Sequence, residues 1–157
     1  MNDKKLRKYT LDLMTRTKAT FLTTIDEMGL PHIRAVENLR NPEKFSHQSK
    51  AFIGYDDEFL VLISTNTSSE KVKHIKNNPN IALYYCILEE YKGVMIRGCA
   101  KIESDLEFKK KIWEDSMKIY YPKGIEDPDF TLIRLIPDYI KAFYNLKTYI
   151  IDLRNKK

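Results

Sequence analysis

The stretch ATFLTTIDEMGLPHIRAVEN, residues 19–38, decides the fold. Its first part, 19–25, is rich in β-branched and aromatic residues, which is typical of a strand. The half-apolar LPHIRAVEN (30–38) is a second strand, and DEMG (26–29) lies between the two. Gly29 can supply the positive φ angle that such a turn needs. The stretch therefore predicts a β-hairpin with two antiparallel strands.

The segments on both sides of this hairpin continue a β-rich order. Apolar residues at helical spacing predict an amphipathic helix over 3–15, and the region 39–57 is turn-rich. Further strands are predicted at 58–65, 80–88, 93–102, 130–137, 139–144 and 148–153, and helices at about 67–77 and 105–121. Because strands that are neighbours in sequence outnumber helical crossovers, we expect a mainly β (α+β) fold in which an antiparallel sheet closes on itself.

The size and charge of the chain limit its organisation and its partners. With 157 residues, of which 43% are hydrophobic and 31% charged, we expect a single domain over 1–157 with a real core. The net charge of +5 is mild, and the lysines are spread along the chain. Nucleic-acid binders usually concentrate positive charge on one face, so no nucleic-acid partner is indicated. The small excess suits an acidic small molecule.

The cysteines, histidines and N-terminal residues exclude several classes of protein. Cys86 and Cys99 have no CxxC spacing, so we expect neither zinc nor a disulfide but two buried free thiols. His32, His47 and His74 are too scattered in the sequence to indicate a metal site. The polar start MNDKKLRKYT is no signal peptide, and no apolar window is long enough to span a bilayer. We therefore expect a cytoplasmic protein with no membrane partner.

A second stretch, ISTNTSSEKVKHIKNNPN (63–80), joins a strand to a helix through a hydroxyl-rich loop. Thr67 and Glu70 have the T-x-x-E spacing of a capping box, which satisfies the free amides at a helix start. Lys71 and Lys73 follow in the first turns, at the positive end of the helix dipole, where a lysine is unfavourable. Either solvent screens these charges or an anion uses them.

The capping box leaves several polar residues of this loop without a role. They are Ser64, Thr65, Ser68, Ser69 and Lys71. Helix starts bind anions readily, hydroxyls donate to phosphate oxygens and lysine supplies a point charge. From the residues alone, phosphate binding and simple capping remain equal alternatives. Arg34 is either an exposed partner of a surface carboxylate or, if its strand lies beside 58–65, a second cation for the same phosphate.

Four segments of the chain, in order, resemble the FMN-binding split β-barrels of the pyridoxamine phosphate oxidase-like superfamily. The opening hairpin, with its pattern A-T-L-A-T-x-D-x-x-G-x-P-H-x-R, is similar to ATFLTTIDEMGLPHIRAV. The third strand, phosphate loop and helix are similar to LVLISTNTSSEKVKHIKNNPNIALYY, and the next strand to VMIRGCAKIES. The tail of the general-stress-protein-like branch, with P-x-G-x-x-D-P-D-Y, is similar to IWEDSMKIYYPKGIEDPDFTLIRLIPDYIKAFY. The resemblance runs from about Ala19 to Tyr144.

The resemblance implies a six-stranded antiparallel split β-barrel with flanking helices, built as a homodimer with FMN at the subunit interface. The cofactor-binding residues that it implies are Arg34, Ala35, Val36, Glu37, Ser64, Thr65, Ser68, Ser69 and Lys71. Among them, Arg34 and Lys71 would contact the FMN phosphate, and the backbone of 35–37 would line the isoalloxazine edge. Aromatic side chains of a partner subunit, among the types found here at Trp113, Tyr120 and Tyr121, would close the flavin site.

The sequence also departs from the pattern of true pyridoxamine phosphate oxidases. Those enzymes have a second lysine after the arginine strand, where this chain has Leu39. The arginine of their S-R-K loop is replaced here by Glu70, and the glutamine that opens a later strand is replaced by Gly93. The arginine-rich C-terminal signature is absent, since the chain ends YIIDLRNKK. Losing two charge-assisted contacts of about 1–2 kcal/mol each should weaken FMN binding by one to three decades. Vitamin B6 oxidation is therefore not expected.

Two classes of function compete. The first is an FMN-dependent oxidoreductase that acts on a small molecule, in which the protein binds and orients a cofactor that carries the chemistry. No residue stands out as an acid, base or nucleophile. The second is a non-catalytic flavin- or haem-binding protein, such as a sensor, store or stress protein, with the histidines as candidate haem ligands. A small-barrel nucleic-acid binder ranks last, because NIALYYCILEEYK has tyrosines but few interspersed cations.

Overall fold

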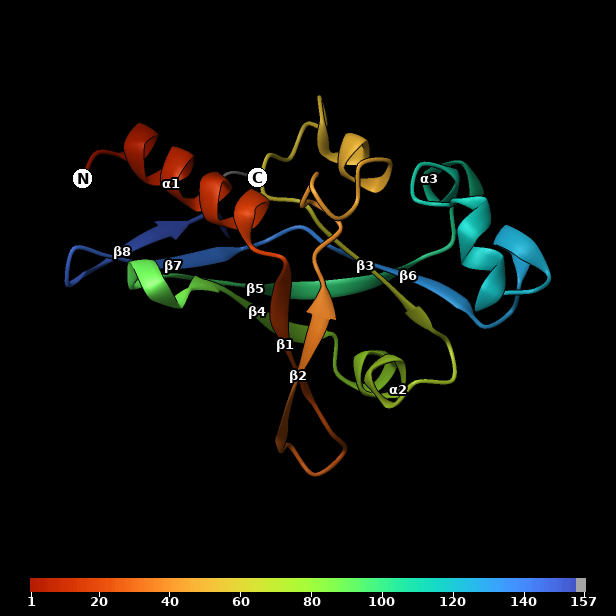
Figure 1. Ribbon diagram of the computed structural model, residues 1–157. Coiled ribbons are helices and arrows are strands. Elements are labelled where there is room, and N and C mark those ends of the chain that lie inside the picture. The colour runs from red at the N-terminus through yellow and green to blue at the C-terminus, as the bar shows by residue number, and fades with distance from the viewer. Residues whose placement is uncertain (155–157) are drawn as a thin grey trace.

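The computed structural model, which describes residues 1–154, is an antiparallel sheet with helices packed on its outside (Figure 1). Its strands are β1 (Ala19–Ile25), β2 (Pro31–Glu37), β3 (Val61–Asn66), β4 (Asn80–Ile87), β5 (Lys92–Glu103), β6 (Phe130–Leu135), β7 (Tyr139–Tyr144) and β8 (Lys147–Asp152). Its α-helices are α1 (Asp3–Arg16), α2 (Glu70–Asn77) and α3 (Leu106–Lys110), and its 3-10 helices are η1 (Gln48–Phe52), η2 (Leu88–Glu90), η3 (Asp115–Ile119) and η4 (Gly124–Glu126). The last three residues of the predicted single domain, 155–157, lie outside the described residues.

Six strands follow one hydrogen-bonded path, in the order β2-β1-β4-β5-β6-β3. All neighbours on this path run antiparallel, and the β7–β8 hairpin joins the sheet along β5. The path curls into a half-barrel, so the predicted mainly β, antiparallel split-barrel fold is confirmed. The hairpin at 19–38 is confirmed as well, with Gly29 at a φ of 80° in its turn.

The long strand β5 connects the two halves of the barrel. Its residues 92–99 pair with β4, whereas residues 100–103 pair with β6. Gly98 lies just before this change of partner, where the chain runs close to the β6–β7 connection. A Cβ atom on Gly98 would lie 3.0 Å from Leu135 Cδ1 and 3.1 Å from the carbonyl oxygen of Ile136. The absence of a side chain therefore lets β5 pass close to that connection.

Apolar side chains gather in two clusters on opposite faces of β3. The main cluster fills the barrel and its α1 side, and Ile63 belongs to it. The second cluster lies toward α3 and contains Leu62, Phe108 and Leu132. Successive residues of a strand point to opposite faces, so β3 contributes to both clusters. This alternation also fixes the directions of the two residues that follow, Ser64 and Thr65.

A buried asparagine holds the C-terminal end of α1 against the start of the loop after β2. The Asn38 side-chain amide donates to the carbonyl oxygens of Met14 and Thr17, each at 2.7 Å. Asn38 is 4% exposed. Carbonyl groups at a helix end have no partner within the helix, and a buried one needs another donor. Asn38 supplies that donor.

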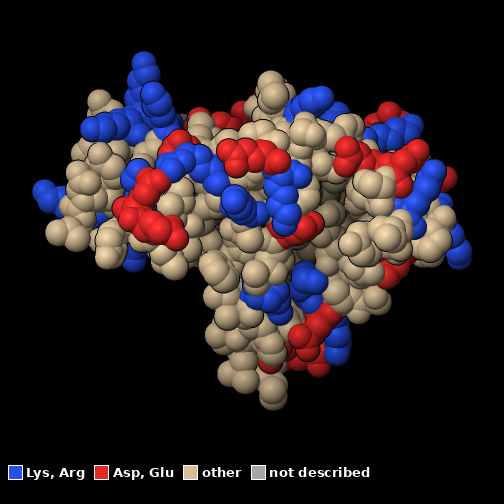
Figure 2. Space-filling model, in the orientation of Figure 1, with Lys and Arg blue, Asp and Glu red and all other residues tan. Residues whose placement is uncertain are grey.

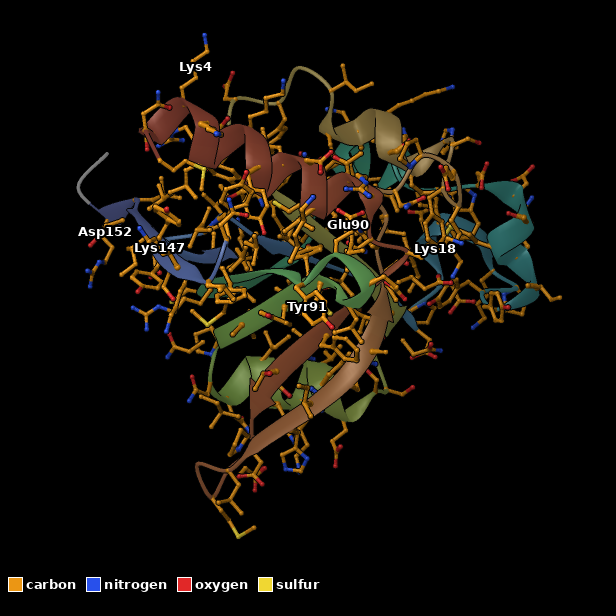
Figure 3. The ribbon with its side chains drawn as sticks, turned by 60° about the vertical axis from the view of Figure 1, so that its left-hand side comes forward. Lys4, Lys18, Glu90, Tyr91, Lys147 and Asp152 are labelled. Carbon is orange, nitrogen blue, oxygen red and sulfur yellow. The ribbon has the colours of Figure 1, made fainter. Side chains whose placement is uncertain are left out.

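An ion-pair cluster fixes the turn between β4 and β5 to the end of α1. Glu90 and Tyr91 lie on this turn (Figure 3), and Glu90 pairs with Arg16 and Lys92. The hydrogen bond from Arg16, followed by that from Lys92, lowers the pKa of Glu90 to about 2. Because the folded pKa lies below the ordinary value, the pair stabilises the fold above pH of about 4.5 and stops doing so as the pH falls toward 2.

Two expectations about local structure are wrong. The predicted helix at 105–121 is helical only over Leu106–Lys110, and 3-10 turns follow. Its apolar residues have helical spacing, but they pack in two places. Phe108 and Ile112 join the second cluster, whereas the ring centroids of Trp113 and Tyr121 lie 5.4 and 5.1 Å from that of Phe130. The cysteines are free as predicted but not buried. Cys99 is exposed because it lies on the face of β5 opposite to Gly98 and Ala100.

The surface carries both signs of charge. Figure 2 shows lysine and arginine interspersed with aspartate and glutamate over the upper body. The arm that projects below it is uncharged along its left side and carries both signs of charge on its right side. Within residues 1–154, no helix combines the length and the apolar character that crossing a membrane requires.

Candidate functional site

Two cations from distant parts of the chain meet at the start of α2. Arg34 comes from β2, where its Nη1 donates to Thr24 Oγ1 at 2.5 Å and to the carbonyl oxygen of His32 at 3.0 Å. Lys71 comes from the first turn of α2, and its Nζ donates to Thr65 Oγ1 on β3 at 2.9 Å. A threonine hydroxyl thus orients each cation, and both side chains are half-buried.

The two positive charges act on each other. Burial lowers the pKa of Lys71, and the nearby charge of Arg34 lowers it further. Burial also lowers the pKa of Arg34, and the field of Glu70 opposes this. Among the described residues 1–154, neither cation forms an ion pair with a carboxylate. Two partly buried like charges without a counterion repel each other, and an anion bound between them would remove that cost.

The cap of α2 also has an unused polar group. The helix begins at Glu70 with Ser69 as its N-cap, and the buried Ser69 hydroxyl has no hydrogen-bond partner in the part of the chain that the structure describes. The predicted capping box of Thr67 and Glu70 is therefore wrong. The Thr67 hydroxyl instead donates to the carbonyl oxygen of Pro128 at 2.8 Å and lies 2.6 Å from Thr131 Oγ1. Ser69 is left as a hydroxyl donor beside Lys71, at a helix start where anions bind well.

The profile of the family described as pyridoxamine 5'-phosphate oxidase matches residues 6–144. The chain belongs to this family. Within the family it is similar to General stress protein 26 of Bacillus subtilis (strain 168), with 26% identity over 144 residues that cover 90% of each chain. The predicted membership and its general-stress-protein-like branch are confirmed.

Solved structures of the pyridoxamine 5'-phosphate oxidase fold agree with this placement. A protein related to general stress protein 26 from Clostridium acetobutylicum is 28% identical, with a TM-score of 0.75 over 98% of both chains. General Stress Protein 26 from Bacillus anthracis str. Sterne (22% identical, TM-score 0.70, 94% of this chain and 98% of that one) shares the fold. A heme binding protein from Mycobacterium smegmatis also shares the fold (13% identical, TM-score 0.68). The match covers 94% of this chain and 58% of that one.

The loop between β3 and α2 is held by Asp129, which the sequence reasoning missed. Its carboxylate accepts from Asn66 Nδ2 at 2.6 Å and from the Ser68 amide at 2.8 Å, and these hydrogen bonds lower its pKa. The amide of Thr67 donates to the Asp129 carbonyl oxygen. Asp129 is the last aspartate of the P-x-G-x-x-D-P-D pattern, to which the sequence analysis assigned no function. The Ser68 amide is thus committed to Asp129.

The other predicted cofactor residues lie in different surroundings. Ser64 follows Leu62 on the face of β3 opposite to Thr65, so its side chain points away from Lys71. Ala35, Val36 and Glu37 lie on β2, and the Glu37 carboxylate pairs with Lys44 at 3.1 Å.

The three aromatic residues near the family's tail motif divide into two kinds. Tyr121 is buried and Trp113 packs against it, with ring centroids 6.4 Å apart, whereas Tyr120 is 73% exposed. Tyr120 is therefore the one of the three with a ring free to contact another chain.

Two histidines that are distant in the sequence are neighbours in this pyridoxamine 5'-phosphate oxidase fold. The ring centroids of His32 and His74 lie 4.8 Å apart. His32 lies near the hairpin turn on β2, and His74 is buried on α2, so packing of α2 against the hairpin brings them together. The expectation that the histidines are too scattered is wrong for this pair, because sequence distance says nothing of contacts between elements.

Proposed function

We propose that this chain binds FMN through the cation pair at the start of α2 and serves as a flavin-dependent oxidoreductase for a small molecule. The observation that supports it best is the half-buried pair of Arg34 and Lys71, which forms no ion pair with a carboxylate within residues 1–154. The orphaned Ser69 hydroxyl fits the same guest, since a phosphate accepts from hydroxyl, guanidinium and ammonium groups alike. A bound flavin supplies electron or hydride transfer.

In this proposal the side chains of the chain bind and orient the phosphate. Arg34 donates in a bidentate manner, Lys71 adds a point charge, and Ser69 donates its hydroxyl. Thr24 and Thr65 hold the two cations in place. Glu70 occupies the position of the arginine in the S-R-K loop of true pyridoxamine phosphate oxidases. Its negative charge opposes the binding of the phosphate. We therefore propose an FMN site that is weaker than that of the true oxidases.

We further propose that the protein is a homodimer whose interface includes the β1–β2 hairpin. β2 ends the strand path, and its residues alternate between exposed and half-buried, so none is buried. Met28 and Ile33 of the hairpin are 78% and 69% exposed, and Figure 2 shows an uncharged surface along the left side of the projecting arm. A shallow groove of about 460 Å³ near this arm is lined partly by Tyr84, Met95 and Phe143. Apolar surface of this kind marks a protein interface.

An Ile33→Asp variant is expected to be monomeric where the unmodified protein is dimeric. The substitution places a charge in the proposed apolar interface, where it would lose its water without gaining a partner. Sedimentation velocity at matched concentrations measures the change. Ile53→Asp is the control, because Ile53 is 80% exposed at the end of η1, which lies above the sheet in Figure 1, whereas the hairpin projects below it. A monomeric unmodified protein, or equal dimers in both variants, would contradict this interface.

The binding proposal is tested on the purified protein by its visible spectrum and by titration with FMN. We expect a flavin spectrum, or quenching of FMN fluorescence, with one FMN per subunit. Anaerobic reduction by NADH or NADPH, followed by turnover of an added acceptor, then separates an oxidoreductase from a non-catalytic flavin protein. Absence of any chromophore and of binding after FMN is supplied would contradict the proposal.

The second candidate is a haem-binding protein of the same fold. It is favoured by the likeness in fold to the heme binding protein from Mycobacterium smegmatis and by the paired histidine rings of His32 and His74. Imidazole is a common axial ligand of haem iron. A Soret band that appears on addition of haemin, in protein that does not bind FMN, would select this candidate.

A further inference from the structure

A small pocket beside the proposed phosphate site has chemistry of its own. It occupies about 270 Å³ between the turn of the β1–β2 hairpin and α2, and Asp26, His32, Glu70, Lys73 and His74 contribute to its lining. Glu70 is the residue that neither the helix cap nor the phosphate site explains. The pocket gives it two histidine neighbours instead.

The three side chains place ligand atoms close together. One ring nitrogen of each histidine and one carboxylate oxygen of Glu70 all lie within 4.8 Å of one another. His74 is buried, His32 is half-buried and Glu70 is exposed. The group is thus anchored at its base by His74 and open to solvent at Glu70, so an ion can enter.

Each histidine is oriented by an outer hydrogen bond. His32 Nε2 lies 2.8 Å from Asp26 Oδ2, and His74 Nδ1 lies 2.9 Å from Thr24 Oγ1. When these nitrogens carry the ring protons, each ring keeps one nitrogen with a free lone pair. Histidines that bind metals are usually held in this way by a carboxylate or another oxygen, which fixes both tautomer and direction.

We propose that His32, Glu70 and His74 form a three-ligand site for a divalent transition-metal ion, with zinc as the best fit. Two imidazoles and a carboxylate are a zinc ligand set that leaves a fourth position for water. Imidazole ligands disfavour magnesium and calcium, which take oxygen ligands. In a tetrahedral site, zinc bonds of about 2.0–2.1 Å place two ligand atoms about 3.4 Å apart, so ligand atoms that lie within 4.8 Å would close by up to about 1.4 Å.

The surrounding charges permit a cation at this place. Glu70 and Asp26 are negative and neutral imidazoles add no charge, whereas Lys73 is paired with Glu27 at 3.1 Å on the rim of the pocket. Arg34 lies close enough to interact with the charge of Glu70, and its own positive charge opposes the binding of a metal ion. The carboxylate of Asp26 offsets this repulsion from the other side of His32.

The test is calorimetric titration of untagged, metal-free protein with zinc chloride, repeated with cobalt(II) to record its visible absorption. We expect one ion per chain and a tetrahedral cobalt spectrum. Glu70→Gln and His32→Gln should each weaken zinc binding at least tenfold. Asp26→Asn should weaken it about ten- to hundredfold, because it removes the outer partner of His32.

His47→Gln is the matched control, since His47 is the histidine outside this cluster and its loss should leave zinc affinity unchanged. Glu70 is exposed, so its substitution is not expected to impair folding, and thermal melts of all variants verify this. The proposal is overturned if the unmodified protein does not bind zinc or cobalt. It is equally overturned if Glu70→Gln and His32→Gln retain full affinity, or if His47→Gln lowers it as much as they do.

Discussion

A double variant, Arg34→Gln with Lys71→Met, is expected to bind FMN at least about a hundredfold more weakly than the unmodified protein. Each cation makes a charge-assisted contact to the phosphate in the proposed site, and a contact of about 1.4 kcal/mol corresponds to a factor of ten. Fluorescence titration of FMN measures the loss. Both substitutions keep most of the side-chain length, so that they remove charge rather than packing.

Lys73→Met is the matched control, because Lys73 lies on the same helix but pairs with Glu27 at an exposed position. It should bind FMN with unchanged affinity. In the absence of FMN, the double variant should be at least as resistant to heat as the unmodified protein, since two partly buried like charges have been removed. Equal FMN affinity in the double variant and the control would exclude these cations from the cofactor site.

Asn38→Ala is expected to lower the free energy of unfolding by about 1–3 kcal/mol, because it removes the Asn38 donor of the buried Met14 carbonyl and leaves the Thr17 carbonyl with a long hydrogen bond from Asn41 Nδ2 at 3.3 Å. Surface substitutions usually cost less than this, so the effect should stand out. Urea unfolding followed by circular dichroism measures it as a lower midpoint with an unchanged slope.

Asn77→Ala is the control for this variant. Asn77 is the exposed last residue of α2 and makes one long hydrogen bond to Glu27 at 3.3 Å. Its loss should change the free energy of unfolding by no more than about 0.5 kcal/mol. If both asparagine variants unfolded at the same urea concentration, the link between α1 and the loop after β2 would contribute little to stability.

The fold was predictable where local chemistry and long-range packing agree. The stretch 19–38 combines a strand-forming run with a glycine at the turn, and each part favours the same hairpin. The prediction for 105–121 failed because helical spacing of apolar residues does not show that one continuous helix presents them. Phe108 and Ile112 pack in the second cluster, whereas Trp113 and Tyr121 pack against Phe130 after the helix has ended. No glycine or proline within that stretch marks the end of the helix after Lys110.

The candidate site was predictable in part. Lys71 and Ser69 stand out in the sequence because a helix start with surplus hydroxyls and a lysine favours an anion. The role of Asp129 was not predictable, because it depends on the segment before β6 folding over the loop after β3. The pairing of His32 with His74 likewise depends on how α2 packs against the hairpin, and periodicity within either element carries no such information.

The pairing of β3 has a consequence for the way the chain folds during synthesis. β3 stands at the end of the strand path and pairs with β6, more than 60 residues further along the chain. At about 5–20 residues per second, a ribosome needs roughly 3 to 13 seconds to deliver that partner, and meanwhile the apolar strand has no sheet to join. Such non-local pairing folds slowly and exposes nascent chains to aggregation. We therefore expect the yield of folded protein to depend on slower expression at low temperature, or on a chaperone that binds the nascent chain before residue 135 has been synthesised.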